Sequence, residues 1–88
     1  MKVAIKVFAM LAKTVSKNLR NRYPEGVKPG STIDLEMPEA STVSDLMDLL
    51  GIVKRNGLIT LVNGKAQQGD FRLSEGDEIG IFPPVGGG

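Results

Sequence analysis

Hydrophobic and polar residues alternate near both ends of the chain, a pattern typical of strands that bury one face. In residues 2–8 the valines and isoleucine at odd positions share one side, so Phe8 falls on the other. In residues 78–82 the two isoleucines share one side and Phe82 falls on the other. The sequence therefore predicts a first and a last strand that each carry a large ring on the outer face.

Two segments change to the period of a helix. In residues 10–22, leucine and valine recur every four residues, with lysine and arginine on the opposite side. The clearer helix covers residues 42–50, where the Thr42 hydroxyl can cap the amide of Asp45 and apolar residues follow at i, i+3, i+4 and i+7. Gly51 supplies a left-handed stop to this second helix.

Three further strands complete the predicted set. Residues 32–37 alternate and are closed by Pro38, and residues 58–62 form an apolar run that only Thr60 interrupts. The Asn-Gly pair that follows favours a two-residue turn into a short fourth strand. We therefore expect an α+β fold, with a mixed sheet of four to five strands and the helix of residues 42–50 packed across it as a crossover.

The length allows one domain. We place it at residues 1–84 and treat residues 85–88 as a flexible glycine tail. Hydrophobic residues make up 41% and charged residues 24% of the 88, which is typical of a folded domain. The apolar runs are too short to span a membrane, so we expect a cytoplasmic protein without membrane contact.

Cysteine and histidine are both missing from the sequence. Their absence removes disulfides, thiolate nucleophiles, imidazole bases and the usual zinc sites. Carboxylates occur in pairs at Asp45 and Asp48 and at Asp77 and Glu78, but both pairs are typical of a solvated surface. We therefore expect no catalytic residue, no metal and no bound cofactor in this chain.

Charge is distributed unevenly along the sequence. Residues 1–28 carry seven Lys or Arg against the single acid Glu25, and residues 29–88 carry four against nine acids, which leaves a net charge of +1. Aromatic residues are not interleaved with the bases, as they are in many nucleic-acid-binding surfaces. We expect a solvated basic helix face and no nucleic-acid partner, with an acidic protein partner as the alternative.

The last eight residues, IFPPVGGG, are the most unusual feature of the sequence. From Pro84, four residues reach about 13 to 14 Å, and glycines let the walls of a narrow channel close on the backbone. The group presented at the tip is the carboxylate of Gly88. With a pKa of about 3.5 it is ionised and a poor electrophile, so acyl chemistry needs a partner that brings ATP. The alternative is a frayed terminus.

The stretch GDEIGIFPPVGGG, residues 76–88, resembles the C-terminal signature of the MoaD/ThiS-like sulfur carriers. Two shorter blocks, STVSDLMDLLG at 41–51 and LVNGK at 61–65, resemble the capped helix and the Asn-Gly turn of that family, and the N-terminal KVAIKVFA is similar as well. Residues 10–32 depart from the pattern, because they are longer and more basic than expected of the small subunit of molybdopterin synthase.

The resemblance implies a ubiquitin-like β-grasp fold and a carrier function. An E1-like adenylyltransferase, which uses ATP, would adenylate Gly88 and convert it to a thiocarboxylate. The tail would then enter a molybdopterin synthase large subunit-like protein and donate sulfur to a pterin precursor, so catalysis is expected on the partners. The residues inserted with the tail are Val85, Gly86 and Gly87.

Three alternatives to the molybdopterin pathway stay open at this point. The same thiocarboxylate can serve thiamine synthesis or tRNA thiolation. A ubiquitin-like modifier would instead join Gly88 to lysines of target proteins. A pure interaction module would carry an inert tail.

We expect both outer rings to be left in water and, because the first and last strands of a β-grasp sheet are neighbours, to meet beside the tail. Such an apolar patch is typical of an interface. The partner-docking residues expected from this are Phe8, Phe82, Pro83 and Pro84. The alternative is that Met10 and Leu11 fold over the rings and bury them.

Overall fold

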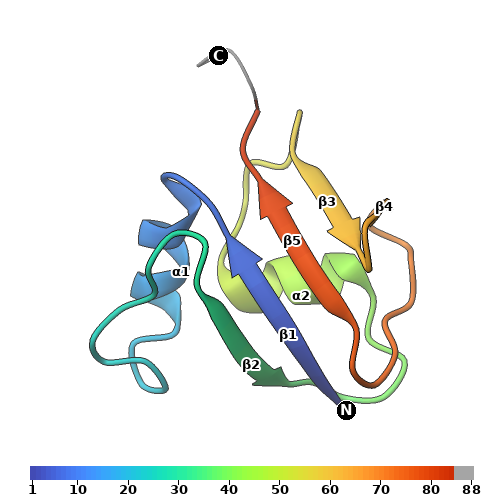
Figure 1. Ribbon diagram of the computed structural model, residues 1–88, viewed down its shortest axis with the longest axis horizontal. Coiled ribbons are helices and arrows are strands. Elements are labelled where there is room, and N and C mark those ends of the chain that lie inside the picture. The colour runs from blue at the N-terminus through green and yellow to red at the C-terminus, as the bar shows by residue number, and fades with distance from the viewer. Residues whose placement is uncertain (85–88) are drawn as a thin grey trace.

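The computed structural model describes residues 1–84, and the tail of residues 85–88 lies outside the described residues. The described chain forms two helices and a five-stranded mixed sheet (Figure 1). The elements are β1 (Lys2–Val7), α1 (Leu11–Asn18), β2 (Thr32–Glu36), α2 (Val43–Leu50), β3 (Ile59–Val62), β4 (Lys65–Ala66) and β5 (Glu78–Phe82). The predicted fold class and order of elements are confirmed.

The sheet has the order β2-β1-β5-β3-β4, so the first and last strands lie side by side at its centre. β1 and β5 run parallel, with Ile5 opposite Ile79 and Val7 opposite Ile81. The other neighbouring pairs are antiparallel. Because the two central strands are parallel, both of them end at the same end of the molecule, where the tail begins (Figure 1).

The core lies between one face of the sheet and the two helices. α2 crosses behind the strands in the view of Figure 1. Its inward residues are buried against the odd-numbered residues of β1 and the isoleucines of β5. The buried side chains of α2 are Val43, Leu46, Met47 and Leu50. The opposite face of the sheet is turned toward the viewer in Figure 1, and neither helix covers it. We call it the uncovered face.

The ends of α2 have the predicted local chemistry. The amide of Asp45 donates to Thr42 Oγ1 at 3.1 Å, and the amide of Thr42 donates to Asp45 Oδ2 at 2.9 Å. This capping box satisfies two of the free amides at the start of the helix. Gly51 closes the other end with φ +78, in the left-handed region.

The first helix is shorter than its sequence pattern predicts. The spacing of leucine and valine predicts a helix over 10–22, but α1 ends at Asn18. Leu19 is buried at 6% exposure while its φ of −107° already departs from the helix. The amide of Tyr23 then donates to the Leu19 carbonyl at 2.8 Å and turns the chain away. The four-residue spacing therefore predicted correctly that Leu19 is buried, but it did not predict that the helix ends before Leu19.

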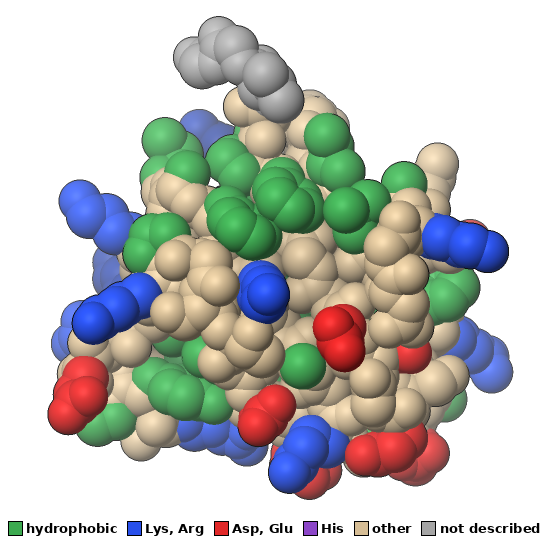
Figure 2. All heavy atoms as spheres, viewed as in Figure 1, with side chains coloured by type: hydrophobic (Ala, Val, Ile, Leu, Met, Phe, Trp, Pro, Cys, Tyr) green, Lys and Arg blue, Asp and Glu red, His purple; other side chains and the backbone are tan. Residues whose placement is uncertain are grey.

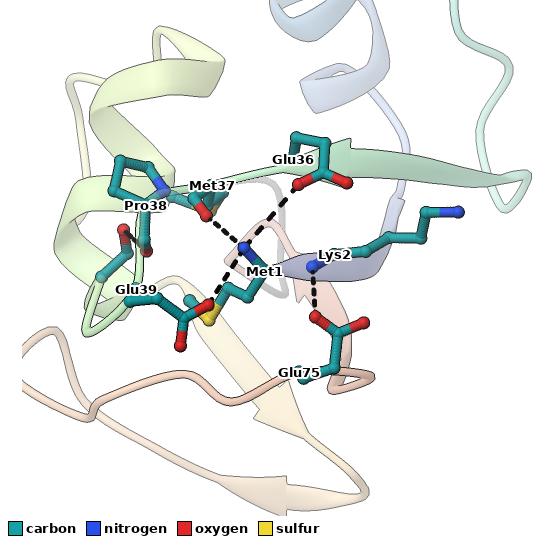
Figure 3. A network of polar contacts seen from close by, with 8 residues as sticks. Met1, Lys2, Glu36, Met37, Pro38, Glu39 and Glu75 are labelled. Carbon is teal, nitrogen blue, oxygen red and sulfur yellow. Dashed lines mark hydrogen bonds and ion pairs between the residues drawn. The ribbon is translucent and has the colours of Figure 1, made fainter.

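The α-amino group of Met1 is held among acceptors at the end of the sheet where β1 begins (Figure 3). It donates to the Met37 carbonyl at 2.7 Å and lies 3.2 Å from Glu39 Oε2 and 3.7 Å from Glu36 Oε2. The hydrogen bond with Glu39 is the main reason that the pKa of the Met1 ammonium is raised above its ordinary value of 8.0. Burial opposes this shift, and the charges of Glu39, Glu36 and Glu75 add to it.

This network predicts a stability that declines at alkaline pH. A group whose pKa is raised on folding stabilises the protein fully below its unfolded pKa, here 8.0, and loses that contribution as pH rises through its folded pKa. We expect the urea midpoint to fall as the pH rises above about 8. Acetylation of the Met1 amino group should lower the midpoint at neutral pH and flatten this decline. An equally steep decline in the acetylated protein would contradict the assignment.

None of the helices in residues 1–84 is long and apolar enough to cross a membrane.

Candidate functional site

The predicted meeting of the two outer rings is confirmed. Phe8 directly follows β1 and Phe82 ends β5, and their rings stack with centroids 4.4 Å apart and planes 8° from parallel. The parallel register that pairs Val7 with Ile81 brings the next residue of each strand together. A stacked aromatic pair contributes about 0.5 to 1.5 kcal/mol beyond the area that it buries.

The stacked rings lie close to the backbone of two glycines. A Cβ placed on Gly80 would lie 3.3 Å from Cε1 of Phe82, so this ring lies over the Gly80 backbone. A Cβ on Gly30 would lie 3.6 Å from Cε1 of Phe8. The two rings are therefore packed on the outer face of the sheet and do not project freely from it.

This packing corrects the expectation that both rings stand in water, because each of them is half-buried. The alternative in which helix residues cover the rings is also wrong. Leu11 belongs to the core with 8% exposure, and Met10 is 73% exposed. Part of each ring thus stays accessible on the uncovered face.

Two further apolar residues join the rings from β3. Ile59 lies opposite Phe82 in the antiparallel register, and Leu61 lies opposite Gly80. Ile59 is 44% exposed and Leu61 is half-buried. The sequence did not single out these residues, because an apolar run from residue 58 to 62 does not show which positions face outward. The pairing of β3 with β5 in the structure shows that Ile59 and Leu61 lie on the outer face.

Phe8, Ile59, Leu61 and Phe82 form what we call the tail-proximal patch. Hydrophobic side chains gather in the upper part of the uncovered face, and charged side chains lie below them and at the flanks (Figure 2). A shallow hollow on this face is lined by the patch residues Phe8, Leu61 and Phe82 and by the exposed charges Lys6 and Glu78. An apolar centre with a charged rim is the composition of a protein interface.

The remaining predicted site residues lie at and beyond the end of β5. Pro83 is half-buried and Pro84 is exposed, and both lie next to the patch in the chain. The predicted insertion residues Val85, Gly86 and Gly87 and the predicted acceptor Gly88 lie outside the described residues. The structure thus places the base of the tail at the apolar end of the uncovered face.

The basic segment forms a separate surface. Lys13, Lys17 and Arg20 are exposed and line a hollow with residues 24–27. Within residues 1–84, these three bases and Arg22 form no ion pair with an acidic side chain. The solvated basic face stays a prediction.

A mixed sheet with parallel central strands, a helix packed across one face and a chain leaving from the last central strand is the ubiquitin-like β-grasp fold. The family model of the ThiS family matches residues 18–88, and the chain belongs to that family of ubiquitin-like sulfur carriers. The match includes the C-terminal glycines and leaves out β1 and most of α1.

Solved structures agree with this assignment. SAMP1 from Haloferax volcanii is 25% identical, with a TM-score of 0.68 and complete coverage of both chains. A structure of H. volcanii small archaeal modifier protein 1 gives 24% identity, a TM-score of 0.68 and coverage of 96% of this chain and 98% of that one. A protein from Pyrococcus furiosus, assigned as molybdopterin converting factor subunit 1, has the same fold at 24% identity, with a TM-score of 0.66 and coverage of 97% and 99%. A comparison with curated protein sequences gave no match.

Proposed function

We propose that this chain is a sulfur carrier whose Gly88 carboxylate is adenylated and thiocarboxylated by an E1-like enzyme. The observation that carries the proposal is the ThiS family match, which runs through the last residue of the PPVGGG ending. The position of the tail base beside an exposed apolar patch supports it, because a partner that takes the tail must also contact the surface around it.

The chemistry requires two displacements on the partner enzyme. A carboxylate oxygen of Gly88 attacks the α-phosphorus of ATP, and pyrophosphate leaves. Hydrosulfide (HS⁻) delivered by the partner then attacks the acyl carbon, AMP leaves with the original oxygen, and the thioacid formed loses its proton. The net change at Gly88 is one oxygen replaced by sulfur. Activation is needed because an ionised carboxylate with a pKa of about 3.5 is a poor electrophile.

For the pathway, we propose sulfur donation to a pterin precursor in molybdenum or tungsten cofactor synthesis. The Pro-Pro-Val sequence before the glycines supports this branch of the family over the thiamine and tRNA branches. The second partner is then a protein like the large subunit of molybdopterin synthase, which receives the loaded tail and supplies the catalytic residues. The tail-proximal patch with Pro83 and Pro84 is the docking surface for these partners.

The second candidate function is a ubiquitin-like protein modifier. The match to SAMP1, which is 25% identical over its whole length, favours this candidate because that protein is described as a modifier. The modifier would use the same activated Gly88 and transfer it to lysine amines of target proteins. Isopeptide-linked conjugates in an extract of the source cells would distinguish the modifier from a carrier.

Mass spectrometry of the protein made in its own cells tests the proposal. We expect a fraction of the C-terminal peptide to carry one sulfur in place of one oxygen at Gly88. The measurement must localise the change to this peptide, because oxidation of any of the four methionines gives nearly the same mass shift. A C-terminal peptide without sulfur, in cells that are synthesising the pterin cofactor, would contradict the proposal.

A further inference from the structure

The loop between α2 and β3, residues 51–58, approaches the base of the tail. Gly57 has φ +80, in the left-handed region, and a Cβ placed on it would lie 3.1 Å from Cγ and 3.2 Å from Cβ of Pro84. Such contacts are tighter than ordinary van der Waals separations, so Pro84 would have to move by a few tenths of an ångström. The backbone of Gly57 therefore packs directly against the last described residue.

Both ends and the middle of this loop are fixed to the domain. Ile52 is buried at 3% exposure, and Leu58 packs against the core. Between them, Arg55 Nε donates to the Ile52 carbonyl at 2.8 Å, and its guanidinium also donates to Ser44 Oγ at 3.1 Å and pairs with Asp48. The contact with Pro84 is thus made by a loop that is tied to α2.

The strand ladder does not determine the direction of the chain after Phe82. The last ladder pair of β5 joins Phe82 to Ile59. Pro83 and Pro84 have no amide hydrogen, so neither can donate to a ladder. The direction of these two residues depends on packing, and they share one hollow with the loop and with Met10.

We propose that the 51–58 loop is a positioning element that sets the direction in which the tail leaves the domain, with Gly57 as the positioning residue. This inference rests on the proposed function, because aiming matters when the tail must enter a partner's channel. The loop supports Pro84, and the stacked rings hold Phe82 on the sheet. A small misplacement of a reacting group is enough to slow a reaction by about a hundredfold.

The chain offers a matched control for this inference. Gly57 and Gly64 both have left-handed backbones, with φ +80 and +85, so alanine meets the same kind of backbone strain at either position. A Cβ at Gly64 meets nothing within 4 Å, whereas a Cβ at Gly57 meets Pro84. A difference between Gly57→Ala and Gly64→Ala therefore measures the contact with Pro84.

The first readout is the thiocarboxylate fraction of the C-terminal peptide, in protein made in its own cells at matched expression. We expect Gly57→Ala to lower this fraction by at least about tenfold and Gly64→Ala to leave it within about twofold of wild type. Asparagine tolerates the left-handed region and still carries a Cβ, so Gly57→Asn should show the same loss. Normal loading of Gly57→Asn would assign the loss to backbone strain and overturn the inference.

The second readout needs no partner. In amide NMR spectra of the isolated protein, Gly57→Ala should shift the Val85 and Gly86 resonances, and Gly64→Ala should leave them in place. Unchanged Val85 and Gly86 resonances in Gly57→Ala would overturn the inference. If wild-type protein carries no thiocarboxylate, the proposed function fails and this second readout alone decides the positioning role of Gly57.

Discussion

A chain extended by one residue after Gly88 is expected to lose thiocarboxylate formation completely, with no fall in its melting temperature. The extension converts the Gly88 carboxylate into a peptide bond and moves the free α-carboxylate one residue beyond the position at which the partner would adenylate it. Gly87→Val should have the same effect, because a branched side chain prevents the walls of a narrow channel from closing on the backbone. Within residues 1–84 the buried core runs from Val3 to Ile81, so we expect neither change to alter it.

The measurement pairs mass spectrometry of the C-terminal peptide with thermal unfolding of each variant. Gln68→Val, in an exposed loop between β4 and β5, is the control for introducing valine and should load normally. A parallel loss of melting temperature and sulfur loading in the tail variants would show that the terminus is structural. The carrier proposal would then lose its main support.

Much of the fold follows from local patterns that tertiary packing did not override. The alternation in residues 2–8 and 78–82 identified the inner and outer faces of β1 and β5 because each strand buries only one side. The Thr42 and Asp45 pair identified the start of α2 because a capping box depends on residues three positions apart. These features depend only on residues close together in the chain, so they could be predicted from the sequence.

Other features depend on contacts between distant segments, and the sequence pattern did not show them. Ile59 joined the tail-proximal patch through its pairing with Phe82, and only the sheet register specifies that pair. The close approach of Gly57 to Pro84 joins residues 27 positions apart in loops of no regular period. The half-burial of the rings likewise depends on how they stack on each other and on Gly80.

Phe82→Ala is expected to separate docking from folding. If the tail-proximal patch docks on the E1-like enzyme, loss of the ring should weaken binding by about 2 kcal/mol or more, which is roughly thirtyfold in Kd. The ring is half-buried, so the isolated protein should lose only about 1 to 2 kcal/mol of its free energy of unfolding. Titration calorimetry with the enzyme and urea unfolding of the free protein measure the two quantities.

Phe71→Ala is the matched control, because Phe71 is the one phenylalanine of the three in the sequence outside the stacked pair, and it packs against the core away from the patch. It should lower the free energy of unfolding without weakening binding to the enzyme. A loss of about 3 to 5 kcal/mol in Phe82→Ala would instead place Phe82 in the core, since that is the cost of deleting a fully buried phenylalanine.

Full binding affinity in Phe82→Ala would show that the enzyme does not dock on the uncovered sheet face when it takes up Gly88. The docking partner would then have to approach the tail from the side of Met10 and the 51–58 loop, where Met10 and Val53 are the most exposed large apolar residues of the described chain.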